Sequence, residues 1–285
     1  MKYLLLSLAL LPVRAFAQDG NFFLDQEYTI DGDGTLDLIC GDADVRITGS
    51  NRTTAHVVIR REVTTQGVVK GNRTFSVDVS EENGNLVIRE KQTGHLSVSL
   101  GYVSEEYTID IEVPQEVSLH LKVDDGPLTV QRLKGAITVQ SDDGDVLLQD
   151  CTSEAFDLDV DDGDIEMNRG QGELVIRIDD GDVSVQEGNF SRVDVSADDG
   201  DIELTTRLTD QGTYRVEVSD GDIDVNITGG GGEFDIRHDD TQVDTSGPFN
   251  LVKSSDDYTQ LTLPEGNATV ELRVDDGRVA LSTAN

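Results

Sequence analysis

The chain of 285 residues is strongly acidic, with 57 Asp and Glu residues against 22 Lys and Arg residues and a formal net charge of −35. This charge excludes nucleic acid as a natural partner, because affinity for nucleic acid rests on cations that neutralise phosphates. The acidity does not indicate disorder, since the apolar residues are dense, rich in Val and Ile and regularly alternating with polar ones. We expect a folded protein with a solvated acidic surface.

Residues 1–17 have the features of a cleavable secretory signal peptide. Lys2 supplies an early cation, an apolar stretch runs from Leu4 to Val13, and small residues flank Phe16. No cysteine stands at the expected cleavage point before Gln18, and no later apolar run approaches the roughly 20 residues that cross a bilayer. We therefore expect an exported protein of the periplasm or cell envelope, or a secreted one, that is not membrane-embedded.

Residues 18–114 contain several segments of strand character and no helical period. Apolar and polar residues alternate over 36–48, 55–63, 74–79, 86–89, 96–100 and 107–113. We interpret this N-terminal β region as the first strands of an all-β protein. It is also the expected cap for one end of a repetitive stack, because uncovered terminal strands are open edges.

Residues 115–285 repeat an Asp-Asp-Gly-Asp turn about every 19 residues. Clear copies occupy 142–145, 161–164, 179–182 and 198–201, the shorter copy 220–222 continues the series, and partial copies lie at 124–126 and 275–277. At 239–240 and 256–257 the aspartates persist, although Thr241 and Tyr258 replace the glycine. We expect these two positions to keep the register of the repeat.

Apolar residues keep fixed positions relative to each turn glycine, at minus seven, minus five, minus three, plus two and plus four. Around Gly163 these positions hold Phe156, Leu158, Val160, Ile165 and Met167, and the pattern recurs around Gly181, Gly200 and Gly221. The residues between them are mostly Asp, Glu, Arg, Ser and Thr. One face of each strand is therefore predicted to be buried and the other to face water.

Two architectures satisfy this pattern. Asp-Gly as a two-residue hairpin turn would give an antiparallel meander. An arch, with its two strands in different sheets, would instead give a single-stranded β-solenoid of about 19 residues per coil. We favour the β-solenoid, because stacked coils bury their apolar faces against one another, whereas a long meander leaves its apolar face uncovered.

The chain also resembles a known family of secreted or envelope-associated bacterial proteins, the putative-adhesin family, a domain of unknown function with repeated Gly-Asp turns. The resemblance is carried by the stretch 111–114, of sequence IEVP, and by the strand, Gly-Asp turn and strand alternation of residues 119–150. It implies a β-helix-like fold and a non-catalytic envelope role. This chain departs by placing Asp before the glycine, which puts an uncharged binding surface in doubt.

The aspartates of the turns are candidate Ca²⁺ ligands, because stacking would bring carboxylates of successive coils together and Ca²⁺ prefers oxygen ligands. The candidates are Asp143, Asp145, Asp162, Asp164, Asp180, Asp182, Asp199, Asp201 and Asp222. The alternative interpretation is turn chemistry: glycine supplies a positive φ, and Asp tolerates turn conformations and bonds local backbone groups. We favour turn chemistry, with weak Ca²⁺ binding as the second possibility.

The sequence gives little support for catalysis. The histidines are scattered, and neither Gly-x-Ser-x-Gly nor His-Glu-x-x-His occurs. His238 stands at an inward position, where we expect a satisfied or partly exposed histidine. The alternative enzyme is a polysaccharide hydrolase or lyase, which needs one distinct pair of carboxylates, and no pair is singled out. We expect a non-enzymatic adhesin or scaffold whose partner is a protein or a carbohydrate.

The chain contains two cysteines, Cys40 and Cys151. Export would place them in a compartment where thiols tend to oxidise. They occupy different places in the repeat. A disulfide between them and two separate thiols are equally compatible with the sequence.

Overall fold

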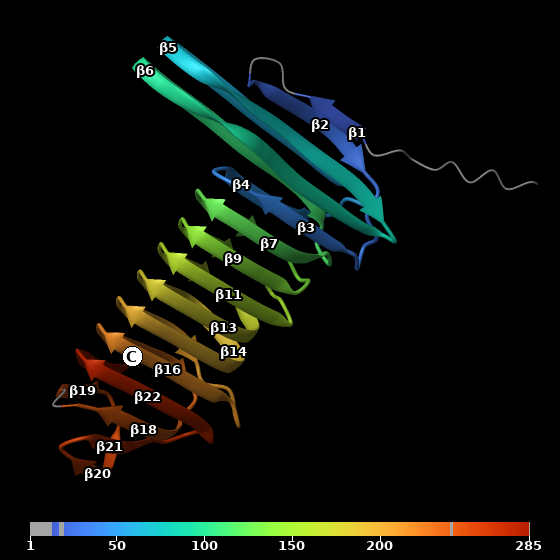
Figure 1. Ribbon diagram of the computed structural model, residues 1–285. Helices are drawn as coiled ribbons and strands as arrows, with labels where there is room; N and C mark the ends of the chain where they lie inside the picture. The colour runs from blue at the N-terminus through green and yellow to red at the C-terminus, as the bar shows by residue number, and fades with distance from the viewer. Residues whose placement is uncertain (1–12, 17–19, 240–241, 285) are drawn as a thin grey trace, which may run out of the picture.

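The computed structural model describes residues 13–16, 20–239 and 242–284, and in these ranges the chain is built from β-strands (Figure 1). The predicted signal peptide lies outside the described residues except for β1 (Val13–Phe16), which pairs antiparallel with the later strand β5. Nothing helical in the described ranges has the length and apolarity that a membrane crossing requires.

The body of the protein is a stack of coils, each of which contributes one strand to each of two parallel sheets. In stacking order the first sheet contains β3 (Thr35–Cys40), β7 (Ser118–Asp125), β9 (Ile137–Asp143), β11 (Ala155–Asp162), β13 (Gln171–Asp180), the second part of β14 (Val183–Asp199), β16 (Thr213–Asp220), β22 (Ala268–Asp276) and β18 (Gly232–His238). The second sheet contains β4 (Asp44–Ser50), β8 (Leu128–Gln131), β10 (Val146–Gln149), β12 (Ile165–Asn168), the first part of β14, β15 (Ile202–Arg207), β17 (Ile223–Gly229), β23 (Arg278–Thr283) and β19 (Gln242–Ser246).

The predicted β-solenoid is therefore confirmed. The strands on the two sides of a turn do not pair with each other: β9 pairs in parallel with β7 and β11, and β10 pairs in parallel with β8 and β12. The alternative antiparallel meander is wrong for this stack.

The core lies between the two sheets and consists of the side chains that the repeat pattern predicts. All five inward residues around Gly163 are at most 1% exposed, and the equivalent residues of the neighbouring coils are buried as well. Burying one such side chain contributes about 1.5–3 kcal/mol. The stack thus needs no second layer to cover its apolar faces.

A long antiparallel ribbon of β5 (Ala55–Glu82) and β6 (Asn85–Pro114) covers the N-terminal end. Residues 86–89 of β6 pair in parallel with β3, and residues 108–114 pair in parallel with β4, so the ribbon closes both sheets. β2 (Phe22–Tyr28) then pairs antiparallel with β5. The stack itself begins at β3, ahead of the boundary at residue 114 that the sequence predicts.

At the C-terminal end the stacking order departs from the chain order. The last coil, β22 and β23, stacks directly on the coil of β16 and β17, and the coil of β18 and β19 lies beyond it. Stacking in chain order would instead place the coil of β18 and β19 directly on that of β16 and β17. Glycine accounts for the difference: the turn after β22 contains Gly277, whereas the turn after β18 contains none, and only glycine fits closely against Gly221.

The expectation that residues 256–257 keep the register of the repeat is wrong. They form the turn of an antiparallel hairpin between β20 (Asn250–Ser255) and β21 (Tyr258–Leu263), and β21 pairs antiparallel with β18. This hairpin extends the first sheet at its C-terminal end (Figure 1).

Candidate functional site

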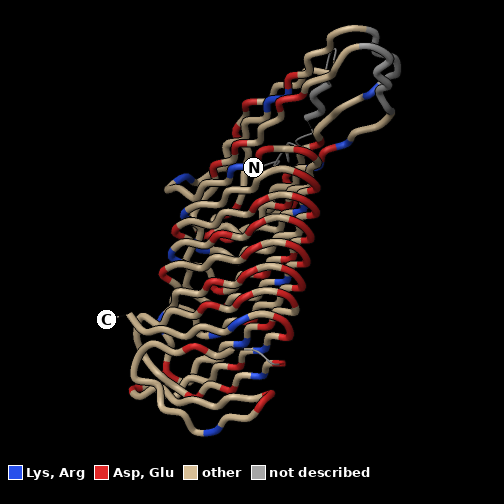
Figure 2. Tube along the Cα trace, turned by 90° about the vertical axis from the view of Figure 1, so that its left-hand side faces the viewer, with Lys and Arg blue, Asp and Glu red and all other residues tan. Residues whose placement is uncertain are grey.

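The Asp-Gly-Asp turns lie above one another along one edge of the stack and form the acidic edge visible in Figure 2. The residues immediately before the glycines are in register and make one row: Asp125, Asp143, Asp162, Asp180, Asp199, Asp220 and Asp276. The residues immediately after the glycines make a second row: Asp145, Asp164, Asp182, Asp201 and Asp222. The edge thus repeats the same chemistry in successive coils.

The turn glycines are required by two independent constraints. Gly163 and Gly181 have φ values of 130° and 144°, which side chains rarely adopt. A Cβ added to Gly181 would also lie 2.4 Å from the carbonyl oxygen of Gly163 in the preceding coil. In these regular coils the turn backbones can therefore approach this closely only because glycine occupies this position.

The carboxylates of the second row complete the hydrogen bonds of the turn backbone. The N–H of Asp182 donates to Oδ1 of Asp164 at 2.9 Å, one coil away. The same bond recurs from Asp164 to Asp145, from Asp201 to Asp182 and from Asp222 to Asp201, at 2.8–3.0 Å. These bonds, which form an Asp ladder, are exposed to solvent, so each one contributes modestly, but their repetition in successive coils gives the repeated aspartate a structural reason.

Among the described residues, the carboxylates of the first row have no comparable donors, and they crowd one another. Partial desolvation, together with the neighbouring carboxylates of Asp143 and Asp180, raises the pKa of Asp162. Desolvation and the charges of Asp180 and Asp220 likewise raise the pKa of Asp199. Like charges on neighbouring strands are destabilising, so the first row is the part of the edge that gains from cations.

The nine predicted Ca²⁺ ligands are thus divided between two rows with different surroundings. Among the described residues, no cluster of three or more His, Cys, Asp or Glu side chains has a geometry suited to hold a metal ion. All five ligands of the second row already accept a backbone hydrogen bond, and Asp222 also forms an ion pair with Arg278 at 3.2 Å. The arrangement offers cations a repeated negative edge.

The structure also contains a second repeated conformation that the sequence did not suggest. Six residues after four successive turn glycines the backbone is left-handed, with φ of 55–61°, at Arg132, Asp150, Arg169 and Glu187. Left-handed residues other than Gly, Asn and Asp are uncommon, so no composition signal marks these positions. They turn the chain from the second sheet towards the next coil.

The two cysteines are separate free thiols, both buried. Burial raises the pKa of the thiol of Cys40 and of Cys151, so both remain protonated. His238 is buried, and its Nε2 lies 3.1 Å from the hydroxyl of Thr259. Its Nδ1 is buried without a hydrogen-bond partner among the described residues, so the expectation of a satisfied histidine holds for one ring nitrogen only.

The outer face of the first sheet differs from the acidic edge because its residues change from coil to coil. One row across neighbouring strands reads Lys122, Gln140, Asp159, Arg177, Ser196, Glu217, Arg273 and Arg237. Near the C-terminal end this face is hollowed by a groove of about 250 Å³. The sequence pattern did not identify this groove, because it depends on the order in which the last coils stack.

Two parallel sheets, a repeated glycine turn and a closed N-terminal end define this protein as a capped β-solenoid. The model of the Toastrack DUF4097 family matches residues 35–282, so the chain belongs to that family. The resemblance stated from the sequence is thereby confirmed.

Solved structures with similar folds have low sequence identity to this chain. A putative adhesin from Bacteroides fragilis is 13% identical, with 91% of this chain and 97% of that chain covered and a TM-score of 0.46. A putative adhesin from Parabacteroides distasonis is 14% identical, with 93% and 98% covered and a TM-score of 0.43. No curated protein matched the sequence.

Proposed function

We propose that this protein is a non-enzymatic, exported recognition protein of the cell envelope, an adhesin-like rod whose outer strand faces bind a surface partner. The observation that carries the proposal is the contrast between the acidic edge and the outer face of the first sheet. Stacking dictates glycine and aspartate at the edge, whereas the row from Lys122 to Arg237 varies in charge from coil to coil. Variable polar positions on a rigid repeat are suited to specific recognition.

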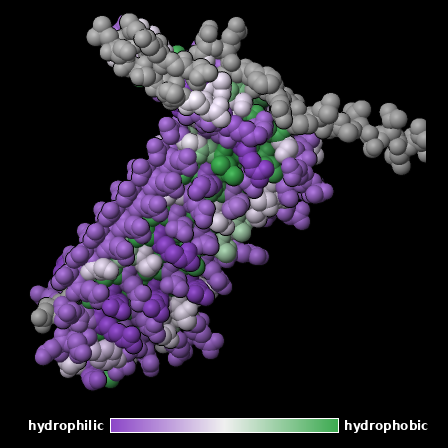
Figure 3. Space-filling model, viewed as in Figure 1, coloured by the Kyte–Doolittle hydropathy of each residue, from purple (hydrophilic) through white to green (hydrophobic). Residues whose placement is uncertain are grey.

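The predicted signal peptide supports export, and the surface supports a soluble envelope protein. Hydrophilic residues dominate the face seen in Figure 3. The ribbon of β5 and β6 and the hairpin of β20 and β21 lie at opposite ends of the stack, so the sheet faces between them remain open to a partner (Figure 1).

The acidic edge would bind Ca²⁺ weakly and without a fixed stoichiometry. The first row, with Asp143, Asp162, Asp180 and Asp199, gains most, because bound cations relieve the repulsion that adds to desolvation in raising the pKa of Asp162 and Asp199. In this proposal the cations condition the stability of the rod and do not form the recognition surface.

Protease treatment of intact cells tests the recognition proposal. A surface adhesin should be degraded by added protease while a periplasmic control protein survives. Complete protection of the protein in intact cells, with degradation only after the envelope is opened, would instead indicate an internal scaffold. An antibody against the mature chain provides the readout in both cases.

A further inference from the structure

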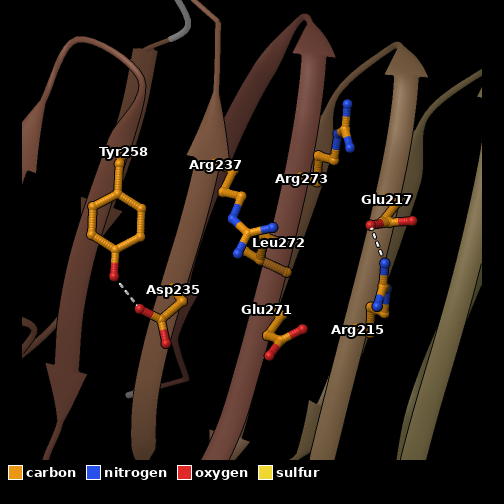
Figure 4. A pocket seen from close by; sticks show the side chains of 8 residues that line it. All are labelled: Arg215, Glu217, Asp235, Arg237, Tyr258, Glu271, Leu272 and Arg273. Atoms are coloured by element: carbon orange, nitrogen blue, oxygen red, sulfur yellow. Dashed lines mark hydrogen bonds and ion pairs between the residues drawn. The ribbon is translucent and has the colours of Figure 1, made fainter.

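The groove on the outer face of the first sheet gathers cations in a chain that has few. Its floor is the buried Leu272 of β22, and its walls come from β16, β22, β18 and β21 (Figure 4). The wall residues are Arg215, Glu217, Asp235, Arg237, Tyr258, Glu271 and Arg273. Three guanidinium groups thus share one hollow in a protein with a formal net charge of −35.

Strand pairing places two of these arginines side by side. Arg237 of β18 is in register with Arg273 of β22, and like charges in such positions are destabilising unless an anion neutralises them. Arg273 forms an ion pair with Asp275 at 3.2 Å, and Arg215 forms one with Glu217 at 2.6 Å. Among the residues that the structure describes, Arg237 forms no ion pair within 4.0 Å, so its guanidinium keeps donors for an anionic ligand.

The remaining groups of the groove are a ring and hydrogen-bond acceptors. The hydroxyl of Tyr258 donates to Asp235, which fixes the ring beside Arg237 (Figure 4). Lys253 Nζ lies 4.9 Å from the ring centroid. The exposed Glu271 lies in register between Arg215 and Asp235. The groove therefore combines guanidinium donors, carboxylate acceptors and one aromatic ring.

This combination distinguishes between classes of ligand. An acidic peptide would use the arginines, but it lacks the hydroxyl donors for Glu217 and Glu271 and the flat apolar sugar face for Tyr258. A saccharide uses all the groups: hydroxyls donate to carboxylates, the apolar face of a sugar ring packs on an aromatic ring, and an acidic substituent binds guanidinium bidentately.

We propose that this groove binds an acidic oligosaccharide, with a carboxylate of the sugar held between Arg237 and Arg273 and a neighbouring sugar ring packed on Tyr258. The proposal rests on the proposed recognition function and names the ligand class of the same outer face. Neutral sugars of equal length lack the group that the arginine pair requires.

Isothermal titration calorimetry of the full mature chain with a tetramer of galacturonate tests the proposal, in 0.15 M NaCl, where the Debye length of about 8 Å screens the distant acidic edge. Wild-type protein should bind this probe, and Arg237→Gln or Arg273→Gln should weaken binding at least about tenfold, the effect of losing one charge-assisted hydrogen bond. Maltotetraose and sodium acetate, the neutral and small-anion probes, should bind at least as weakly as the variants bind galacturonate.

The matched control is Arg177→Gln, which removes an exposed arginine from the same face, paired with Asp157 at 2.9 Å, three strands from β22. It should bind like wild type. If the Arg237, Arg273 and Arg177 variants bound galacturonate equally well, the proposal that the groove is the binding site would be overturned. A recognition function elsewhere on the rod would remain. Failure of wild-type protein to bind galacturonate would also overturn the proposal for the groove, and the cell-surface assay would then judge the recognition function separately.

Discussion

The backbone N–H of Arg278 donates a hydrogen bond of 2.9 Å to Oδ1 of Asp222, although 56 positions separate the two residues in the chain. It is the same bond that joins Asp182 to Asp164 within the regular repeat. The guanidinium of Arg278 also pairs with Asp222 and Asp224, at 3.2 and 3.4 Å. The last coil of the chain therefore continues the Asp ladder at a place that its sequence order does not suggest.

The Asp ladder predicts different effects for two substitutions of Asp164. Asp164→Ala removes the acceptor of the Asp182 N–H and should reduce the free energy of unfolding by about 0.5–1.5 kcal/mol. Asp164→Asn keeps an oxygen acceptor and removes a charge, so its stability should equal or exceed that of wild type. Urea unfolding followed by circular dichroism measures both. If the Asp164→Ala and Asp164→Asn variants proved equally stable, the hydrogen bond of the Asp ladder would not contribute to the free energy of unfolding.

Substitution of a turn glycine should cost much more. Gly181→Val places a Cβ where the carbonyl oxygen of Gly163 lies 2.4 Å away and forces a β-branched residue to φ of 144°. We expect a loss of more than about 2 kcal/mol, from backbone strain and the clash together. Gly163→Val should behave alike. The control is Gly32→Ala, because no heavy atom beyond the chain neighbours lies within 4 Å of its added Cβ. If the melting temperatures of the Val variants equalled that of this control, the turn geometry would be contradicted.

The first row of aspartates predicts a dependence of stability on pH. Desolvation and neighbouring charges raise the pKa of Asp162 and Asp199 of this row, and of the adjacent Asp179, in the folded chain, so the folded state binds more protons than the unfolded state. Their stabilising contribution is fully present below the unfolded pKa of about 3.9 and is lost as pH rises through the raised folded pKa.

Asp162→Asn tests this sign directly. The variant should raise the melting temperature at pH 7 in low salt, where repulsion in wild type is greatest, and should raise it less at pH 4. Differential scanning calorimetry at the two pH values gives the comparison. An equal gain at both would show that charge in this row does not limit stability.

Cation addition should stabilise the protein without selectivity. The melting temperature in millimolar Ca²⁺ should be slightly higher than in chelator, and Mg²⁺ or NaCl at matched ionic strength should reproduce this shift. The reason is that the first row presents charge without a closed ligand cluster among the described residues. A large shift given by Ca²⁺ and not by Mg²⁺ would require ordered sites on the acidic edge.

The thiols should be unreactive in the folded protein. Cys40 and Cys151 are 3% and 1% exposed, and burial raises the pKa of each, so neither supplies thiolate at neutral pH. A thiol-specific chromogenic reagent should react slowly with native protein and rapidly with both thiols in denaturant. Protein that shows no thiol in denaturant without reductant would contain a disulfide instead.

The sequence by itself determined the fold class, the repeat and the inward residues. Positions such as Leu158 and Ile165 are buried because alternation along a strand is local, and a turn of fixed composition keeps every coil in phase. The need for glycine at Gly163 follows from the same local pattern.

Only the tertiary structure decided the order of the last coils and the surface that this order creates. Coils of equal length offer nearly equal partners, so a local pattern cannot choose between them. The turn of the last coil packs closely on Gly221, and Gly277 fits there because it has no Cβ. This contact places β22 between β16 and β18. Arg273 and Arg237 become neighbours for that reason, since residues far apart in sequence share a face only after the strands have paired.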